Sequence, residues 1–140
     1  MITRSFEEEL QINGRLVCPN QGTSMLPLIR HGKDLMVILP RPDRRLKRFE
    51  AVLFRRGDSY VLHRVFKASG DAYIMCADNL SSLERVEDNQ IIGVLHAVLR
   101  DGRNEIRVTS LPYRIYVFIW CCVRTMFRRV IHRWKKLLRS

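Results

Sequence analysis

The sequence predicts a mainly β domain with a short helix before it and one long basic helix after it. Short runs of apolar and β-branched residues alternate with turn residues such as Gly, Asn, Asp and Pro. Several short strands with a turn about every ten residues are typical of an antiparallel sheet that coils into a partly open barrel. The net charge of +11 is uneven, because residues 113–140 hold eight Lys or Arg and no Asp or Glu. We therefore divide the chain into a β domain at 1–110 and an appended amphipathic helix at 111–140.

Size and composition fit one compact domain. A chain of 140 residues can bury a hydrophobic core, and an apolar content of 46% is ordinary for a globular protein. The first residues are acidic where a secretory signal would be basic and then apolar, so no signal peptide is expected. The four cysteines lack metal-ligand spacing, and buried thiols are expected, with a Cys18–Cys76 disulfide as the alternative. We predict no metal and no cofactor, and a cytoplasmic or peripheral membrane location.

The individual elements follow from local patterns. Residues 5–12 are expected to form a short helix, because Ser5 and Glu8 have the spacing of a capping box, with Phe6, Leu10 and Ile12 on the covered side. Apolar, β-branched runs predict strands at 15–18, 35–39, 51–54, 59–67, 72–77, 91–99 and 105–109. The turn sequence at 69–71 predicts a hairpin, which would place the strand holding His63 beside the strand that ends at Asp78.

The C-terminal segment has the pattern of an amphipathic helix. Apolar side chains recur at helical spacing, and Arg and Lys fill much of the remainder. The longest apolar run, 115–123, has nine residues, whereas a membrane-spanning helix needs about 20. A helix lying on an anionic membrane surface is therefore favoured, with contacts from Trp120, Arg124, Phe127, Arg128 and Trp134.

Two alternatives to membrane docking stay open for this helix. It could pack on the β domain with its arginines in water. It could also bind nucleic acid, but the wide apolar stripe and the lack of a recognised nucleic-acid-binding motif argue against that partner.

Three short clusters in the β domain hold a serine, a histidine and an aspartate. They are Gly-Thr-Ser-Met-Leu-Pro at 22–27, Val-Leu-His-Arg-Val at 61–65 and Ala-Asp-Asn at 77–79. Serine becomes nucleophilic when a base takes its proton, histidine is a base near neutral pH, and a carboxylate can fix the histidine tautomer. Ser24, His63 and Asp78 fit these three roles. The alternative for the first cluster is an ordinary surface loop.

In order and spacing, the three clusters resemble the catalytic set of signal peptidase I, in the branch that uses a Ser/His pair. Residues 24–27 resemble the family's Ser-Met-x-Pro motif, 63–65 its His-Arg-Val motif and 77–79 its Gly-Asp-Asn segment. The resemblance covers about residues 20–98 and extends to the peptidase half of LexA-type repressors, which share the fold but use lysine. It implies the signal peptidase/LexA type of β-barrel and a serine endopeptidase acting on a leader or signal-like peptide.

The resemblance also implies roles for neighbouring residues. Thr23, Met25 and Leu26 would line the substrate site. Backbone N–H groups around Ser24, together with Thr23, would be the oxyanion donors. For Met25 and Leu26 an ordinary core position is the alternative. Arg64 would point away from His63 on a strand and pair with an acid. A lysine base, Lys67 or Lys33, is the alternative to His63.

The sequence departs from the family pattern at several positions. Ala77 replaces the glycine before the aspartate, Phe49-Glu50 replaces a Gly-Asp pair, and Lys33 is an extra residue before Asp34. No N-terminal membrane anchor is expected. Asp88 is a candidate second acid, with a solvated loop acid as the alternative. The competing function is an inactive β-domain binding module that docks on membrane or nucleic acid through its basic helix, and the oligomeric state stays open.

Overall fold

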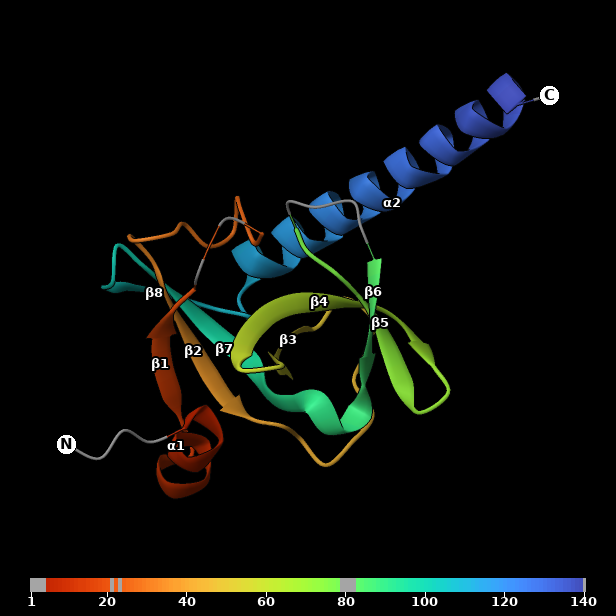
Figure 1. Cartoon of the computed structure of the whole chain (residues 1–140). Helices are drawn as coiled ribbons and strands as arrows, with labels where there is room; N and C mark the ends of the chain where they lie inside the picture. Colours follow the sequence, from red (N-terminus) through yellow and green to blue (C-terminus); the bar gives the residue numbers. More distant parts are fainter. Residues whose placement is uncertain (1–4, 21, 23, 79–82, 140) are drawn as a thin grey trace.

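The computed structural model describes residues 5–20, 22, 24–78 and 83–139, and it consists of one antiparallel sheet with a helix at each end of the chain (Figure 1). The elements are α1 (Phe6–Asn13), β1 (Leu16–Pro19), β2 (Leu35–Pro40), β3 (Ala51–Arg56), β4 (Ser59–Ser69), β5 (Ala72–Cys76), β6 (Leu83–Glu87), the 3-10 helix η1 (Asp88–Gln90), β7 (Ile91–Arg100), β8 (Asn104–Arg107) and α2 (Leu111–Arg139).

The eight strands form an open sheet. Their order is β1-β2-β7-β3-β4-β5-β6, and β8 pairs with β7 beside this path. All the pairs are antiparallel. The expected mainly β class is therefore confirmed, with a short N-terminal helix and a long C-terminal one.

Most of the expected elements are present. The hairpin at 69–71 joins β4 to β5, and Arg64 lies opposite Cys76, so the strand of His63 does lie beside the strand that leads to Asp78. Ser5 caps α1 by accepting a hydrogen bond from the Glu8 backbone N–H at 3.2 Å. The expectation that Ile12 is covered is wrong, because its side chain is 61% exposed at the end of this short helix.

Strand β6 was not predicted from the sequence. Three of its five residues are charged, and only Val86 is buried. Its strand character comes from pairing with β5, in a register that sets Met75 opposite Glu84. A neighbouring strand, rather than an apolar pattern, thus fixes the backbone of 83–87.

The core consists of two hydrophobic clusters. The larger one holds Met25, Leu53, Leu62 and Ala77 together with residues of α1, β1, β2, β7 and α2. The smaller one is built from Phe54, Val65, Met75, Val86 and their neighbours on β3 to β7. Leu62 and Val65 of β4 belong to different clusters, because alternate residues of a strand face opposite sides of the sheet.

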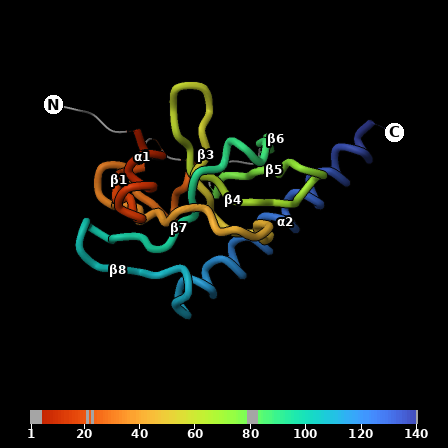
Figure 2. Tube along the Cα trace, turned by 90° about the horizontal axis from the view of Figure 1, so that it is seen from below, coloured from red at the N-terminus to blue at the C-terminus, as the bar shows by residue number. Residues whose placement is uncertain are grey.

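Helix α2 runs along the sheet and then leaves it. Tyr113 and Cys121 are its buried residues, and from residue 129 onward every described residue is exposed. In Figures 1 and 2 the C-terminal turns project beyond the strands. Nowhere in the described chain is there a helix with the length and apolar character needed to cross a membrane.

Gly93 on β7 lies where β2 approaches most closely. A Cβ added there would sit 2.5 Å from Ile38 Cγ2 and 2.7 Å from the Leu39 carbonyl oxygen. We expect Gly93→Ala to lower the free energy of unfolding by about 1–3 kcal/mol, because a backbone carbonyl cannot move aside as a side-chain end can. Urea denaturation measures this loss. Gly57→Ala, where no atom lies within 4 Å of the added Cβ, is the comparison and loses only about 1 kcal/mol from its left-handed backbone. Equal midpoints for Gly93→Ala and wild type would contradict the close approach.

Candidate functional site

A buried ion pair between Arg64 and Asp78 lies at the centre of the candidate site. Arg64 Nε donates to Asp78 Oδ1 at 2.8 Å and Nη2 to Oδ2 at 3.0 Å. Both side chains are almost fully buried, at 0% and 2% exposure. Burial by itself would lower the pKa of the Arg64 guanidinium, but the adjacent Asp78 charge outweighs it and holds that pKa above its ordinary value. The expectation that Arg64 pairs with an acid is confirmed.

The same pair attaches helix α2 to the sheet. Tyr116 Oη donates to Asp78 Oδ2 at 2.7 Å, and Trp120 Nε1 donates to the Asp78 carbonyl oxygen at 2.9 Å. Arg64 Nη1 donates to Tyr113 Oη at 3.2 Å. Both oxygens of the Asp78 carboxylate are thus engaged by Arg64 and Tyr116, and the residue connects β4, the end of β5 and the first turns of α2.

The carboxylate beside His63 is that of Glu84, on β6. Its Oε1 lies 3.2 Å from His63 Nδ1, without the geometry of a hydrogen bond, and it also contacts Arg56 Nη2. Sequence reasoning missed Glu84 because it missed β6. The available signal is the spacing of Glu84 and Val86, which places both on one face of a strand, toward the cluster that Val65 also joins.

The imidazole of His63 is buried between an aromatic ring and two charged side chains. It is 7% exposed, and the Phe54 ring packs edge-on against it with 5.7 Å between ring centroids. Burial lowers the pKa of His63 below the ordinary 6.5, the Glu84 carboxylate partly opposes this shift, and the Arg56 charge adds to it. The imidazole is therefore neutral near pH 7, which is the form that can accept a proton.

Ser24 begins the turn that follows β1. It is half-buried, and the next side chain, Met25, is fully buried in the larger hydrophobic cluster. The backbone closes into a turn through a hydrogen bond from Ile29 N–H to the Met25 carbonyl oxygen at 3.0 Å. Met25 is thus a core residue, while Leu26 is half-buried and Thr23 lies outside the described residues, as does Asn79.

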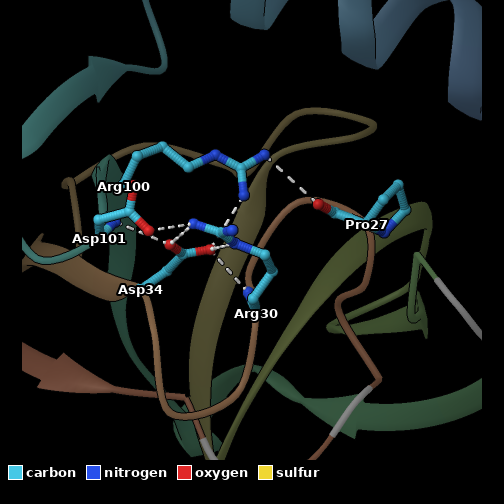
Figure 3. A network of polar contacts seen from close by, with 5 residues as sticks. All are labelled: Pro27, Arg30, Asp34, Arg100 and Asp101. Atoms are coloured by element: carbon cyan, nitrogen blue, oxygen red, sulfur yellow. Dashed lines mark hydrogen bonds and ion pairs between the residues drawn. The ribbon is translucent and has the colours of Figure 1, made fainter.

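A network of charges holds the far end of this turn (Figure 3). Asp34, 1% exposed, accepts hydrogen bonds from Arg30, Arg100 and the backbone N–H of Asp101. The Arg30 hydrogen bonds keep the pKa of Asp34 well below its usual range. Arg100 Nη2 also reaches the Pro27 carbonyl oxygen at 3.4 Å. The serine turn is therefore fastened to the β7–β8 connection.

The three segments converge on one cluster, although among the described residues no hydrogen bond joins their functional groups. Met25, Leu62 and Ala77, each adjacent to one of the three expected residues, all belong to the larger hydrophobic cluster. Among the described residues, no hydrogen bond joins Ser24 Oγ to His63 or His63 to Asp78. The structure therefore brings together His63 with Glu84 and Asp78 with Arg64, and places Ser24 on a separate, fixed turn.

The remaining candidates have other partners. Asp88 forms an ion pair with Arg41 at the surface. His31 is exposed, and its Nδ1 lies 3.2 Å from the Gly22 backbone N. All four cysteines are free, and within the described ranges no group of His, Cys, Asp or Glu has the arrangement of a metal site.

The residues expected to contact a membrane fall into two groups. Trp120 and Arg124 are half-buried, with the Trp120 ring parallel to that of Tyr116 and the Arg124 guanidinium 5.8 Å above Trp120. Arg128 lies 5.6 Å above the Phe66 ring. These three pack against the β domain, whereas Phe127 and Trp134 are 59% and 62% exposed.

Comparison with models of protein families finds no match, and comparison with curated proteins finds no significant match.

The environment of His63 can be tested without reference to any activity. We expect its imidazole to titrate below pH 6.5 in NMR spectra. Glu84→Gln removes the charge that raises the pKa of His63, so the pKa falls further. Arg56→Gln removes a charge that lowers it, so the pKa rises. Shifts in the same direction for both variants would contradict the arrangement of the two charges.

Proposed function

We propose that this protein is a serine endopeptidase resembling signal peptidase, with Ser24 as nucleophile and His63 as general base. The observation that carries the proposal is the neutral, buried imidazole of His63 with a carboxylate at its Nδ1. A hydrogen bond from Nδ1–H to this carboxylate, formed by a small rotation of either side chain, would favour the tautomer that leaves Nε2 free to accept the serine proton. The order of the three motifs along the chain supports the same assignment. We also propose that the sheet is of the signal peptidase/LexA type.

The contacts of the two acids revise the expected triad. Glu84 fits the orienting role better than Asp78: its Oε1 lies 3.2 Å from the imidazole, although it also pairs with Arg56, whereas both carboxylate oxygens of Asp78 are engaged by Arg64 and Tyr116. Asp78 then acts as a structural residue that fixes β4 behind the base. Glu84, on the His63 face of β4, would serve catalysis, and Asp78, on the Arg64 face, would stabilise the fold.

The proposed reaction follows from these positions. Substrate closure would bring Ser24 Oγ to His63 Nε2, since catalytic hydrogen bonds are often long before substrate binds. The serine attacks the scissile carbonyl as its proton passes to His63, and Glu84 stabilises the imidazolium that forms. His63 then gives the proton to the departing amine, and water releases the acyl group from the serine. Backbone N–H groups of the serine turn are the proposed oxyanion donors.

An extended peptide fits this fold as substrate. Among the described strands β1 pairs only with β2, and it precedes along the chain the turn that begins at Ser24. A peptide added as a strand at this free edge would pass beside the serine. Small residues next to the scissile bond follow from the resemblance to signal peptidases.

Ser24→Ala tests the nucleophile. We expect kcat/KM toward a signal-like peptide with small residues at the scissile bond to fall by about 10³-fold or more, because the proposed acyl-enzyme forms on the Ser24 hydroxyl. Cleavage is followed by mass spectrometry in the presence of anionic vesicles. Ser69→Ala, at the end of β4, is the matched control and keeps wild-type cleavage. Hydrolysis by Ser24→Ala at the wild-type rate would disprove the mechanism.

Membrane attachment through α2 forms the second part of the proposal. One side of the helix exposes apolar residues along most of its length: Ile115, Ile119, Val123, Met126, Phe127, Val130, Trp134, Leu137 and Leu138. Basic residues occupy the other side of the projecting half, including Lys135, Lys136 and Arg139. This combination is typical of helices that lie in the interface of an anionic bilayer, and it also favours the competing function, a binding module without catalysis.

Flotation with phosphatidylglycerol vesicles tests this attachment. We expect the full chain to float, and the triple variant Val130→Ser, Trp134→Ser and Leu137→Ser to partition at least about tenfold more weakly, because each buried apolar side chain contributes about 1.5–3 kcal/mol. Ile12→Ser with Val17→Ser, at exposed apolar residues of the β domain, is the control and floats as wild type does. Unchanged flotation of the triple variant would remove the membrane claim. Flotation without any peptide cleavage would favour the binding module.

A further inference from the structure

A groove of about 560 Å³ lies between the first turns of α2 and the sheet. Its apolar wall comes from β3, β7, the segment after β8 and α2, through Ala51, Val94, Leu95, Val108 and Val117. Volumes of 300–1,000 Å³ with mostly apolar linings are typical of sites for small organic ligands. The groove is separate from the residues proposed for peptide cleavage, none of which lines it.

Sheet topology explains why the groove exists. Strand β7 pairs with β3 up to Val94, opposite Val52, and with β8 from Ala97, opposite Arg107. Leu95 lies between these two pairings, so on this side of β7 it pairs with neither β3 nor β8. Helix α2 covers this split in the sheet, and the space left between them forms the groove.

Three basic residues line the groove: Lys47, Arg48 and Arg114. No ion pair with an acid is found for any of them among the described residues. The single acid in the lining, Glu50, accepts two hydrogen bonds from Arg44, at 2.7 and 3.0 Å, and it also attracts the Lys47 charge. One acid thus faces four cations, counting Arg44, and the groove combines an apolar wall with an excess of positive charge, which complements an anionic group attached to a hydrocarbon chain.

Phe49 is held in this lining at a conformational cost. Its φ is 71°, in the left-handed region that bulky residues rarely adopt. Its backbone is fixed there by hydrogen bonds, from its own N–H to the Val65 carbonyl oxygen at 2.6 Å and from Arg64 Nη1 to its carbonyl oxygen at 2.8 Å. The ring itself is only half-buried, and the Arg48 guanidinium lies 4.8 Å above its centroid. A strained residue with a half-exposed ring is typical of a binding site rather than of a core.

We propose that this groove binds a long-chain fatty acid, with the acyl chain along the apolar wall and the carboxylate held by Lys47, Arg48 and Arg114. Charge complementarity favours this occupant over the apolar core of a signal-like peptide, which brings no anion to the three cations. The groove also borders the exposed apolar side of α2, because Phe118 lines it, is 71% exposed and follows the exposed Ile115 by three residues, which makes the two neighbours on the helix surface. A chain leaving the membrane surface could therefore enter beside Phe118. The inference does not depend on the serine chemistry.

Binding of the fluorescent fatty acid cis-parinaric acid to the full chain, below its micelle concentration, tests the proposal. We expect saturable binding to one site, weakened about tenfold or more by Arg114→Gln, which removes a charged contact to the carboxylate. Val117→Trp fills the groove and abolishes binding, while circular dichroism shows an intact fold. Arg129→Gln makes the same change in net charge on the exposed part of α2, away from the groove, and leaves the affinity at the wild-type level.

Two further measurements locate the ligand. The methyl ester of the same acid, which lacks the charge, binds about tenfold or more weakly than the acid. Fatty acid slows the alkylation of Cys122, which lines the groove, as read by mass spectrometry. Wild-type affinity in Val117→Trp, or equal weakening by Arg114→Gln and Arg129→Gln, would overturn the proposal and assign the binding to the helix surface. Vesicle flotation and peptide cleavage by Val117→Trp stay at wild-type levels, so failure here is distinguishable from failure of the proposed function.

Discussion

The buried ion pair of Arg64 and Asp78 is the interaction on which the rest of the structure depends. Removing either partner of such a pair leaves an uncompensated buried charge, at a cost of about 3–5 kcal/mol. Here the pair also gathers the Phe49 carbonyl, Tyr113, Tyr116 and Trp120, so that a strand, a strained loop and a helix share one set of hydrogen bonds. An apolar core could supply comparable stability, but it would not specify which turn of α2 meets the end of β5.

This arrangement divides β4 between two environments. On one face, Arg64 connects the sheet to α2; on the other, His63 lies between Phe54 and Glu84. Alternation along a strand makes this division inevitable for adjacent residues. The strand position of His63, the proposed base, is therefore stabilised by Arg64, which takes no part in the proposed chemistry. The serine turn receives its own support from Asp34 and two arginines.

Helix α2 has two parts with different surroundings. Its first half is fixed to the sheet by Tyr116 and Trp120, and it roofs the groove that Arg114 and Val117 line. Its second half projects from the domain with a continuous apolar side and a basic side. From the sequence, packing on the β domain and docking on a membrane were alternative predictions for this helix. In the structure they apply to successive parts of one helix: the first half packs, and the second half has the surface that we propose for docking.

The sequence by itself determined the local elements, because the periods of apolar residues and the turn residues act over short distances. It predicted the β4–β5 hairpin, the capped first helix, the long basic helix and the pairing of Arg64 with an acid. The neighbour of His63 required the tertiary structure, since β6 has too few apolar residues to be recognised and becomes a strand only by pairing with β5. The same is true of the groove, which arises where β7 changes partners, and of the backbone of Phe49. These features depend on contacts between segments distant along the chain, and the spacing of Glu84 and Val86 is by itself too weak a pattern to predict a strand.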